Sequence, residues 1–263
     1  MAVYARGRTT TSPDADGAPW DEAHAAPGLA PSAPICAIGD VHGRLDLLDR
    51  ALTRVLGWAQ TSGGRIVLLG DYIDRGPESA GVLAYLRHLA ARDLPVVALA
   101  GNHEAMLGAF LDRPEEGRLW LRHGGGATLK SYGLDTPGPD VAPRELSRLA
   151  TALSIAMPEE TRGFLMTRPL AHRSGNLFLS HAGRTTRRGP ADQQPDTLLW
   201  GTGANTRIWR ASDGRRLWSV AGHTVTEVPE IVGETVSIDT GAWQTGVLTL
   251  GRFDAGRVVF ERA

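Results

Sequence analysis

Three glycine-led segments of the chain place carboxylate, amide and imidazole side chains directly after an apolar run. Their sequences are GDVHG at 39–43, GDYIDRG at 70–76 and GNHE at 101–104, after the runs 35–38, 65–69 and 96–100. Apolar runs of this length are typical of buried strands in a parallel sheet, and ligands of such sheets bind beyond the carboxyl ends of the strands. The pattern predicts a site for metal ions or another charged ligand at that edge of the sheet.

Two histidines of the C-terminal half follow apolar runs in the same way. His181 comes after the run 177–180, and His223 comes after the run 218–221 and a glycine. A single strand-end histidine is more often a core residue than a ligand. Recurrence at five predicted strand ends favours one shared site over five unrelated structural positions.

A pair of divalent ions needs one bridging carboxylate and further nitrogen or oxygen ligands on each side. Asp71, which follows the central apolar run, is the natural bridge. We predict two sets of further ligands, Asp40 and His42 on one ion and Asn102, His181 and His223 on the other. The single cysteine, Cys36, lies inside an apolar run and is expected to be buried, so no thiolate is available. The expected cofactor is therefore a pair of Mn, Fe or Zn ions.

Such a pair activates water, because a bound metal ion lowers the pKa of water from about 16 to about 7. Such a hydroxide is a nucleophile that needs no side-chain base, and the planar fork of the Arg75 guanidinium matches two phosphoryl oxygens. His103 is placed to protonate the leaving oxygen, and Asp74 to orient its imidazole. Arg75, Asn102 and His103 are the residues expected to contact the substrate. The alternative for Asp74 and Arg75 is a local ion pair that closes the turn.

The elements that position these residues alternate along the first half of the chain. Leucine and valine recur at helical spacing over 44–60 and 78–92, between the apolar runs, which predicts a parallel sheet with crossover helices. The stretch from about 112 to 166 is predicted to form a small helical cap. Short strands are predicted at 168–172, 176–180, 216–221, 235–238, 245–250 and 257–261, in a second, largely antiparallel sheet. The expected fold class is α/β, with two face-to-face mixed sheets flanked by helices.

Residues 1–33 are rich in Ala, Pro, Asp, Thr and Gly, and they are expected to form a flexible arm with His24 exposed to solvent. Residues 34–263 are expected to form one catalytic domain. The net charge of −1 gives no reason to expect a nucleic-acid or membrane partner, and no apolar stretch is long enough to span a bilayer. Without a signal-peptide pattern, the expected location is the cytoplasm. The oligomeric state stays open.

The five motifs together resemble the signature set of the calcineurin-like metallophosphoesterases, in the phosphoprotein-phosphatase branch. The similarity covers about residues 35–250, and it is greatest to the bacterial and bacteriophage lambda type of serine/threonine protein phosphatase. Shared segments include WLRHGGG at 120–126 and IDTGA at 238–242. The resemblance implies a binuclear centre, usually assayed with Mn, that hydrolyses phosphate monoesters of proteins or small molecules. Some members of the family instead split dinucleoside tetraphosphates or other phosphoanhydrides, and the alternative activity expected here is that of a symmetrical dinucleoside-tetraphosphate hydrolase.

One position departs from the lambda-type pattern. Relatives carry a phosphate-contacting arginine two residues after the tryptophan of a Leu-Trp pair, whereas Thr202 occupies that position here. Arg207 or Arg210 are candidates to replace it. His123 is a candidate for the substrate mouth, and Trp209, Trp218 and Trp243 are expected to be core or strand-face residues. A non-catalytic phosphate-binding module is the alternative from another class, and the complete ligand set argues against it. A metal nuclease would need a basic groove that the charge balance does not favour.

Overall fold

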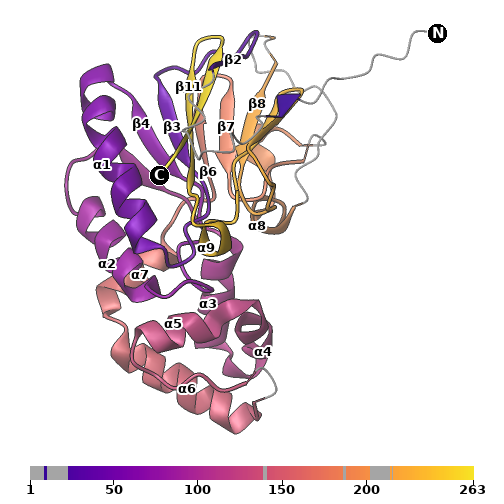
Figure 1. Ribbon diagram of the computed structural model, residues 1–263. Helices are drawn as coiled ribbons and strands as arrows, with labels where there is room; N and C mark the ends of the chain where they lie inside the picture. The colour runs from indigo at the N-terminus through magenta and orange to yellow at the C-terminus, as the bar shows by residue number, and fades with distance from the viewer. Residues whose placement is uncertain (1–8, 11–22, 139–140, 186–187, 202–213, 215) are drawn as a thin grey trace.

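The computed structural model describes residues 9–10, 23–138, 141–185, 188–201, 214 and 216–263, and two mixed sheets form its centre. The sheets stand face to face above a lobe of helices (Figure 1). Within the described residues the strand order is β2-β12-β11-β3-β4-β5 in the first sheet and β1-β9-β10-β8-β7-β6 in the second. This is the α/β architecture that the sequence predicts.

The first sheet carries the glycine-led motifs on three parallel strands. These are β3 (Ile35–Ile38), β4 (Arg65–Leu68) and β5 (Val96–Ala98), paired in that order. Because all three run in the same direction, the loops that follow them meet at one edge of the sheet.

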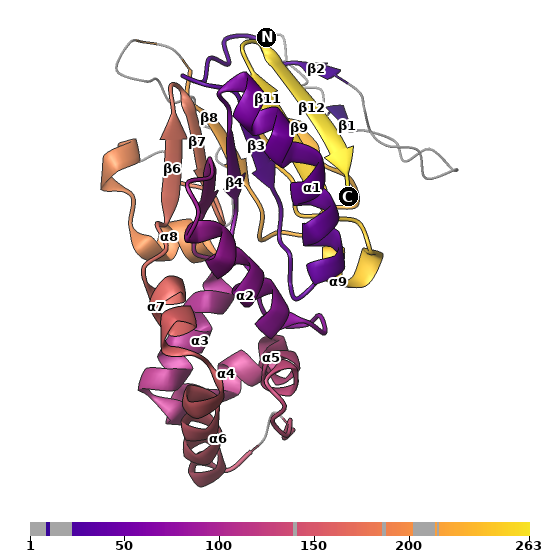
Figure 2. The ribbon, with the colours of Figure 1, turned by 90° about the vertical axis from the view of Figure 1, so that its left-hand side faces the viewer.

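Alternation along the strands divides the core between the two faces of the first sheet. Ile35 and Ala37 pack between the sheets, whereas Cys36 and Ile38 pack against the helices outside. Those helices are α1 (Leu45–Ser62) and α2 (Ser79–Ala90), and Figure 2 shows α1 lying lengthwise over the strands. Both helices bury a leucine-rich stripe, as the helical spacing predicts.

The second sheet is formed by strands of the C-terminal half and β1. Its strands are β6 (Ala171–Ser174), β7 (Leu177–Ser180), β8 (Trp218–Ala221), β9 (Glu230–Val232), β10 (Thr235–Ser237) and β1 (Thr9–Thr10). β7, β8 and β10 are parallel, and the other pairings are antiparallel. The short helix α8 (Pro195–Trp200) covers the outer face, where Leu198 packs on Phe178 and Leu217.

The helical lobe follows β5. It contains α3 (Asn102–Asp112), a 3-10 turn (Pro114–Glu116), α4 (Arg118–Trp120), a π-helical turn (Leu121–Gly125), α5 (Gly126–Ser131), α6 (Pro143–Ala156) and α7 (Glu159–Met166). In Figure 1 the lobe lies below the sheets, so α3 links the edge of the first sheet to the lobe. None of the helices in the described ranges is long and apolar enough to cross a membrane.

Two strand assignments made from the sequence are wrong. The run 245–250 was expected to be a strand of the second sheet, but Ala242–Thr245 is helix α9, and the strand β11 occupies Thr249–Asp254. β11 and β12 (Arg257–Arg262) extend the first sheet beside β3. Paired with β3 in the first sheet, this hairpin buries the apolar side chains of Phe253, Val258 and Phe260 between the two sheets, which favours this placement.

The predicted arm also ends earlier than residue 33. Ala23–Ala25 forms β2, which pairs with β12, and Ala26 and Leu29 are buried between the sheets. His24 is half-buried against Phe260 rather than exposed. Residues 23–33 therefore belong to the packed domain, whereas 1–8 and 11–22 lie outside the described residues.

Candidate active site

The predicted site residues come from loops that end neighbouring strands, and they converge at the edge between the sheets and the helical lobe. Asp40 and His42 follow β3, and Asp71, Asp74 and Arg75 follow β4. Asn102 and His103 open α3, His181 follows β7, and His223 follows β8. Arg75 and His223 are half-buried, and the others are buried.

The backbone of the site lies in an unusual conformation. Among the described residues other than glycine, positive φ angles occur at site positions alone, namely His42, Asp71, Asp74, Arg75 and His223. Such angles are uncommon for residues with a Cβ, and they concentrate at functional sites where the surrounding structure holds them. The loops are therefore shaped to point their side chains inward.

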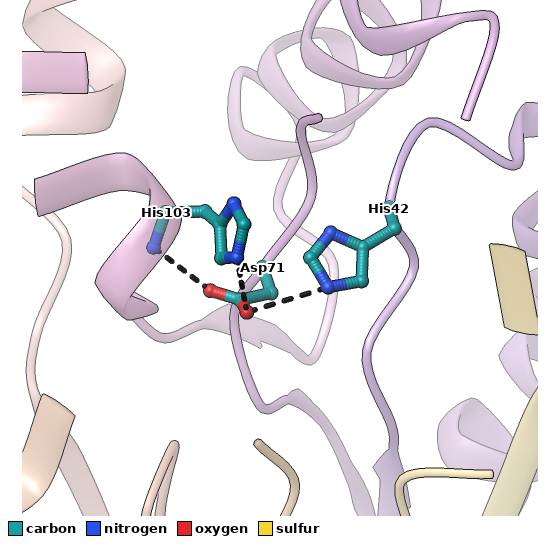
Figure 3. Close-up of side chains that lie close together, drawn as sticks. All are labelled: His42, Asp71 and His103. Carbon is teal, nitrogen blue, oxygen red and sulfur yellow. Dashed lines mark hydrogen bonds and ion pairs between the residues drawn. The ribbon is translucent and has the colours of Figure 1, made fainter. Parts of the chain in front are cut away.

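Asp71 is the residue that two clusters of histidine and aspartate side chains share. One group is His42, Asp71 and His103, and the other is Asp71, His181 and His223. Asp71 Oδ2 lies 3.5 Å from His42 Nε2 and 3.8 Å from His103 Nε2 (Figure 3). Asp71 Oδ1 lies 3.4 Å from His181 Nε2. The two oxygens of one carboxylate thus face two different groups, which is the arrangement that a bridging ligand requires.

Around His181, three acceptor atoms from different loops lie within hydrogen-bonding distance of one another. His181 Nδ1 lies 3.1 Å from the Leu69 carbonyl, to which it donates, so Nε2 carries the lone pair. That nitrogen lies 2.7 Å from Asn102 Oδ1, and His223 Nδ1 lies 3.1 Å from both atoms. Burial lowers the pKa of His181 to about 4, so the ring is neutral near pH 7. Neutral nitrogen and oxygen acceptors this close fit a divalent cation between them.

The group around His42 is arranged in a similar way. His42 Nδ1 donates to the Ile73 carbonyl at 2.7 Å, and burial lowers the pKa of its imidazole to about 3. A carbonyl partner on the far nitrogen is typical of metal-binding histidines, because it fixes the tautomer. Arg75 Nη1 lies 2.8 Å from His42 Nε2, and Arg75 Nη2 lies 3.1 Å from His103 Nε2. The guanidinium therefore contacts the nitrogens that face Asp71.

Asp40 is buried beside these groups without belonging to either one. Its Oδ2 accepts the His223 backbone N–H at 3.0 Å, and its Oδ1 is buried with no hydrogen-bond partner among the residues that the structure describes. A Cβ at position 222 would overlap Asp40 Oδ1, so the close approach of this strand end requires Gly222. An orphaned buried carboxylate oxygen is costly, and a bound cation would satisfy it.

Asp239 is a site residue that the sequence analysis did not single out, although it lies in the IDTGA segment after β10. Burial, followed by the charges of Asp239 and Asp71, raises the pKa of Asp40 well above its usual range. Burial also raises the pKa of Asp239 to about 6. The same strand-end pattern marks this position, but β10 alternates with polar residues and gives a weaker signal. Several buried carboxyl groups at one edge favour the binding of cations.

His103 and Asp74 form the second functional unit. His103 Nδ1 lies 2.7 Å from Asp74 Oδ2, which also accepts the Trp120 indole N–H at 2.9 Å. Thr128 donates to Asp74 Oδ1 at 2.6 Å. Burial opposes a charged imidazole, but Asp71 and then Asp74 raise the pKa of His103. Trp120 and Thr128 belong to the helical lobe, and the sequence analysis missed their part in holding this pair.

Glu104 holds together the loops that follow β4 and β5. Its carboxylate accepts the backbone N–H groups of Gly101, Asp71 and Tyr72, at 2.8 to 2.9 Å. One side chain therefore ties the end of β4 to the start of α3. This contact fixes Asp71 relative to Asn102 and His103.

A cavity of about 490 Å³ opens outside Arg75. It is lined by Arg75, Arg122, His123, Gly124, Val225 and Trp243, so His123 does border the mouth. Trp218 is buried as expected, whereas Trp243 is 38% exposed and is not a core residue. The expectations for the remaining residues fall outside the described part of the chain, namely those for Thr202, Arg207, Trp209 and Arg210.

Comparison with known proteins agrees with this geometry. The family model for calcineurin-like phosphoesterases matches residues 33–226. The chain is 30% identical to the asymmetrical bis(5'-nucleosyl)-tetraphosphatase PrpE of Geobacillus thermodenitrificans over 237 residues, which cover 82% of this chain and 89% of the relative. It is 28% identical to PrpE of Bacillus cereus over 243 residues, which cover 84% and 91%.

Solved structures share the fold. A crystal structure of a protein provisionally assigned as a diadenosine tetraphosphatase matches with a TM-score of 0.57 and 19% identity, over 88% of this chain and 94% of that one. A cold-active protein-tyrosine phosphatase of a Shewanella species matches with a TM-score of 0.54 and 17% identity, over 90% and 83%. With the family model spanning most of the sequence, the chain belongs to the calcineurin-like phosphoesterases, and its buried histidine and carboxylate groups imply that it is a hydrolase using divalent metal ions.

Proposed function

We propose that this protein hydrolyses bis(5'-nucleosyl) tetraphosphates asymmetrically. The observation that carries the proposal is the relatedness to PrpE proteins over more than four fifths of both chains. The aligned stretch is long enough to include the strand-end loops and the helical lobe together. The serine/threonine protein phosphatase activity expected from the sequence then becomes the second candidate.

Asymmetrical hydrolysis breaks the bond from one terminal phosphorus of the tetraphosphate to its bridging oxygen. Water adds its oxygen to that phosphorus, and the bridging oxygen leaves on the triphosphate and takes up a proton. The products are a nucleoside monophosphate and a nucleoside triphosphate. When bound, two divalent ions would activate the water and neutralise phosphoryl charge. In this proposal Asp40, His42, Asp71, Asn102, His181 and His223 hold the ions.

The remaining residues act on the substrate itself. The Arg75 guanidinium is half-buried at the mouth, and its fork matches two oxygens of a phosphoryl group. Asn102, whose Oδ1 lies beside His181 and His223, would also contact the substrate in this proposal. His103 Nε2 points toward Asp71 Oδ2 and Arg75, where a leaving oxygen would need its proton. Asp74, held by Trp120 and Thr128, keeps the His103 ring in this orientation.

The pair of His103 and Asp74 is the observation that favours the second candidate, a phosphomonoesterase acting on proteins or small phosphoesters. An alkoxide leaving group is strongly basic and depends on a general acid, which contributes about 10²- to 10⁴-fold. A triphosphate leaving group is much less basic and needs the acid less. The two candidates therefore predict different costs for losing His103.

A substrate panel run with Mn and then with Zn tests the proposal. The wild-type protein should release nucleoside monophosphate and triphosphate from diadenosine tetraphosphate with a higher kcat/KM than it shows for phosphoserine or phosphothreonine peptides. Symmetrical release of two nucleoside diphosphates would contradict the asymmetrical cut. Phosphate release from the peptides, with the dinucleotide left intact, would replace the proposal with the second candidate.

The variant His103→Asn sharpens the comparison. It should reduce hydrolysis of the tetraphosphate less than hydrolysis of an alkyl phosphate, while the metal content of the protein stays unchanged. An equal rate for wild type and variant on both substrates would remove His103 from the role of acid.

A further inference from the structure

The cavity outside Arg75 contains groups that the hydrolytic site itself does not require. Its wall combines the Arg75 guanidinium with the indole of Trp243 and the side chain of Val225. Val225 is 44% exposed and Trp243 is 38% exposed. Exposed apolar side chains grouped at the mouth of a site mark a place where a ligand binds. The cavity volume of about 490 Å³ lies within the range of small-molecule pockets, about 300–1,000 Å³.

Backbone hydrogen bonds fix the turn that carries Trp243. It belongs to α9, which is bounded by Gly241 and Gly246, both at positive φ. Asp239 Oδ1 accepts the Gly241 N–H at 2.9 Å, so the turn that carries Trp243 is tied to the carboxyl group beside Asp40. A tryptophan side chain has a rigid ring and only two side-chain torsions, so it loses little entropy when a flat ligand stacks on it.

The distance between Trp243 and Arg75 suits a nucleotide. Arg75 Cζ lies over one face of the Trp243 ring, 5.6 Å from its centroid, while the same guanidinium contacts His42 and His103 in the site, so a base would stack on the opposite face of the indole. A nucleotide carries a flat base and a phosphate on one sugar. Its phosphate would meet Arg75 while its base meets the indole. Arg122 also borders this cavity, where its charge suits a polyphosphate chain.

We propose that Trp243 stacks on the nucleobase next to the phosphate that is attacked, and that it thereby selects nucleotide substrates over other phosphate compounds. This inference rests on the proposed tetraphosphatase activity and names a residue that would determine its specificity. Every base has a π face, so stacking on an indole tolerates different bases. The enzyme should therefore accept both diadenosine and diguanosine tetraphosphate.

The test compares Trp243→Ala with wild type on two substrates that share the phosphate chain. Loss of a stacking partner should lower kcat/KM for diadenosine tetraphosphate by about 5- to 150-fold, mainly through KM. Inorganic tetrapolyphosphate has no base, so its kcat/KM should change by less than about twofold on the same argument. Trp243→Phe keeps an aromatic face and should recover most of the loss. Equal losses on both substrates would show that Trp243 acts only through Arg75, and no loss on either would overturn the proposal.

Trp58→Ala provides a matched control. Trp58 also lies beside an arginine, with Arg252 Cζ 6.0 Å from its ring, but it borders a different cavity with Pro34, before β3, and Phe253. Its removal should leave the ratio of the two kcat/KM values unchanged. A lowered ratio in this variant would mean that the change in Trp243→Ala is not specific to the mouth of the site.

A further measurement keeps this inference separate from the proposed activity. If wild type does not cleave diadenosine tetraphosphate, the proposed function fails, but stacking is still testable through inhibition of aryl phosphate hydrolysis. Trp243→Ala should then weaken inhibition by adenosine monophosphate by about fivefold or more, and inhibition by inorganic phosphate by less than about twofold. Equal changes for the two inhibitors would contradict stacking on Trp243.

Discussion

The imidazole of His103 and the carboxylate of Asp74 form a buried pair, with Nδ1 and Oδ2 2.7 Å apart. Four further hydrogen bonds hold Asp74, because Trp120 and Thr128 donate to its carboxylate oxygens and its own backbone N–H donates to Ser79 and Thr128. His103 directly follows the proposed metal ligand Asn102, so the contact with Asp74 orients the His103 imidazole beside the metal site. The acid and the metal ligands are thus positioned by the same short segment.

Replacement of Asp74 should change the pH dependence of turnover. The charge of Asp74 helps to raise the pKa of His103, and a general acid works only below its own pKa. In Asp74→Asn the pKa of His103 falls, so the alkaline limb of the kcat/KM profile should move to lower pH. Activity at the optimum should fall by about 10- to 100-fold, as for other residues that orient a catalytic group. An unmoved alkaline limb would show that His103 does not set it.

Arg75→Ala should weaken the binding of phosphate. A charged hydrogen bond contributes about 1.5–3 kcal/mol, which corresponds to about a 10- to 150-fold rise in the inhibition constant of free phosphate. Arg75→Lys keeps the charge but loses the planar fork, so it should give an intermediate value. Competitive inhibition of aryl phosphate hydrolysis measures this constant. The same constant in wild type and Arg75→Ala would contradict the assignment.

Binding of Mn should release protons. Burial and the neighbouring carboxylates raise the pKa of Asp40, which favours its protonated form in the metal-free protein, and that proton must leave before the carboxylate binds a cation. His42 and His181, with pKa values lowered to about 3 and about 4, are already neutral near pH 7 and release none. Affinity should therefore increase as pH rises, until it reaches the raised pKa of Asp40.

Calorimetry in buffers of different ionisation enthalpy measures the number of protons released. Asp239→Asn removes the largest charge that raises the pKa of Asp40, so this variant should release fewer protons than wild type. Metal affinity that is independent of pH, with no proton released, would argue against Asp40 as a buried protonated ligand.

Glu104→Gln should destabilise the fold. Glu104 Oε1 accepts one backbone N–H and Oε2 accepts two, and an amide NH₂ cannot accept in either position. One buried N–H would lose its partner, at a cost of about 1–3 kcal/mol in the free energy of unfolding. Urea unfolding of the metal-free protein measures the change. Glu159→Gln, whose carboxylate is exposed and paired with Arg162, should stay within about 0.5 kcal/mol of wild type. Similar losses in both variants would contradict an anchoring role for Glu104.

Local sequence patterns identified the site residues because an apolar run followed by glycine and a ligand type specifies a strand end. That pattern depends on neighbours in the chain, and it placed Asp40, Asp71 and Asn102 at one edge of the first sheet. Asp239 follows a strand whose residues Thr235 and Ser237 are polar, and the weak apolar signal there hid it.

Contacts between distant segments could not be predicted in the same way. The bonds from Trp120 and Thr128 to Asp74 depend on how the helical lobe packs on the sheet edge. β11 pairs with β3 in the first sheet. The alternation of apolar and polar residues along β11 would be the same in either sheet, so it could not predict this pairing. The exposure of Trp243 follows from α9, a helix too short to leave a periodic pattern.

The central claim is that one carboxylate, that of Asp71, joins two divalent cations at this site. A crystal structure of the protein soaked in Mn, with anomalous scattering recorded at the Mn edge, tests it most directly. The account predicts two Mn peaks per chain, one on each side of Asp71, with His42 beside one and His181 and His223 beside the other. A single peak, or two peaks that share no contact with Asp71, would contradict it.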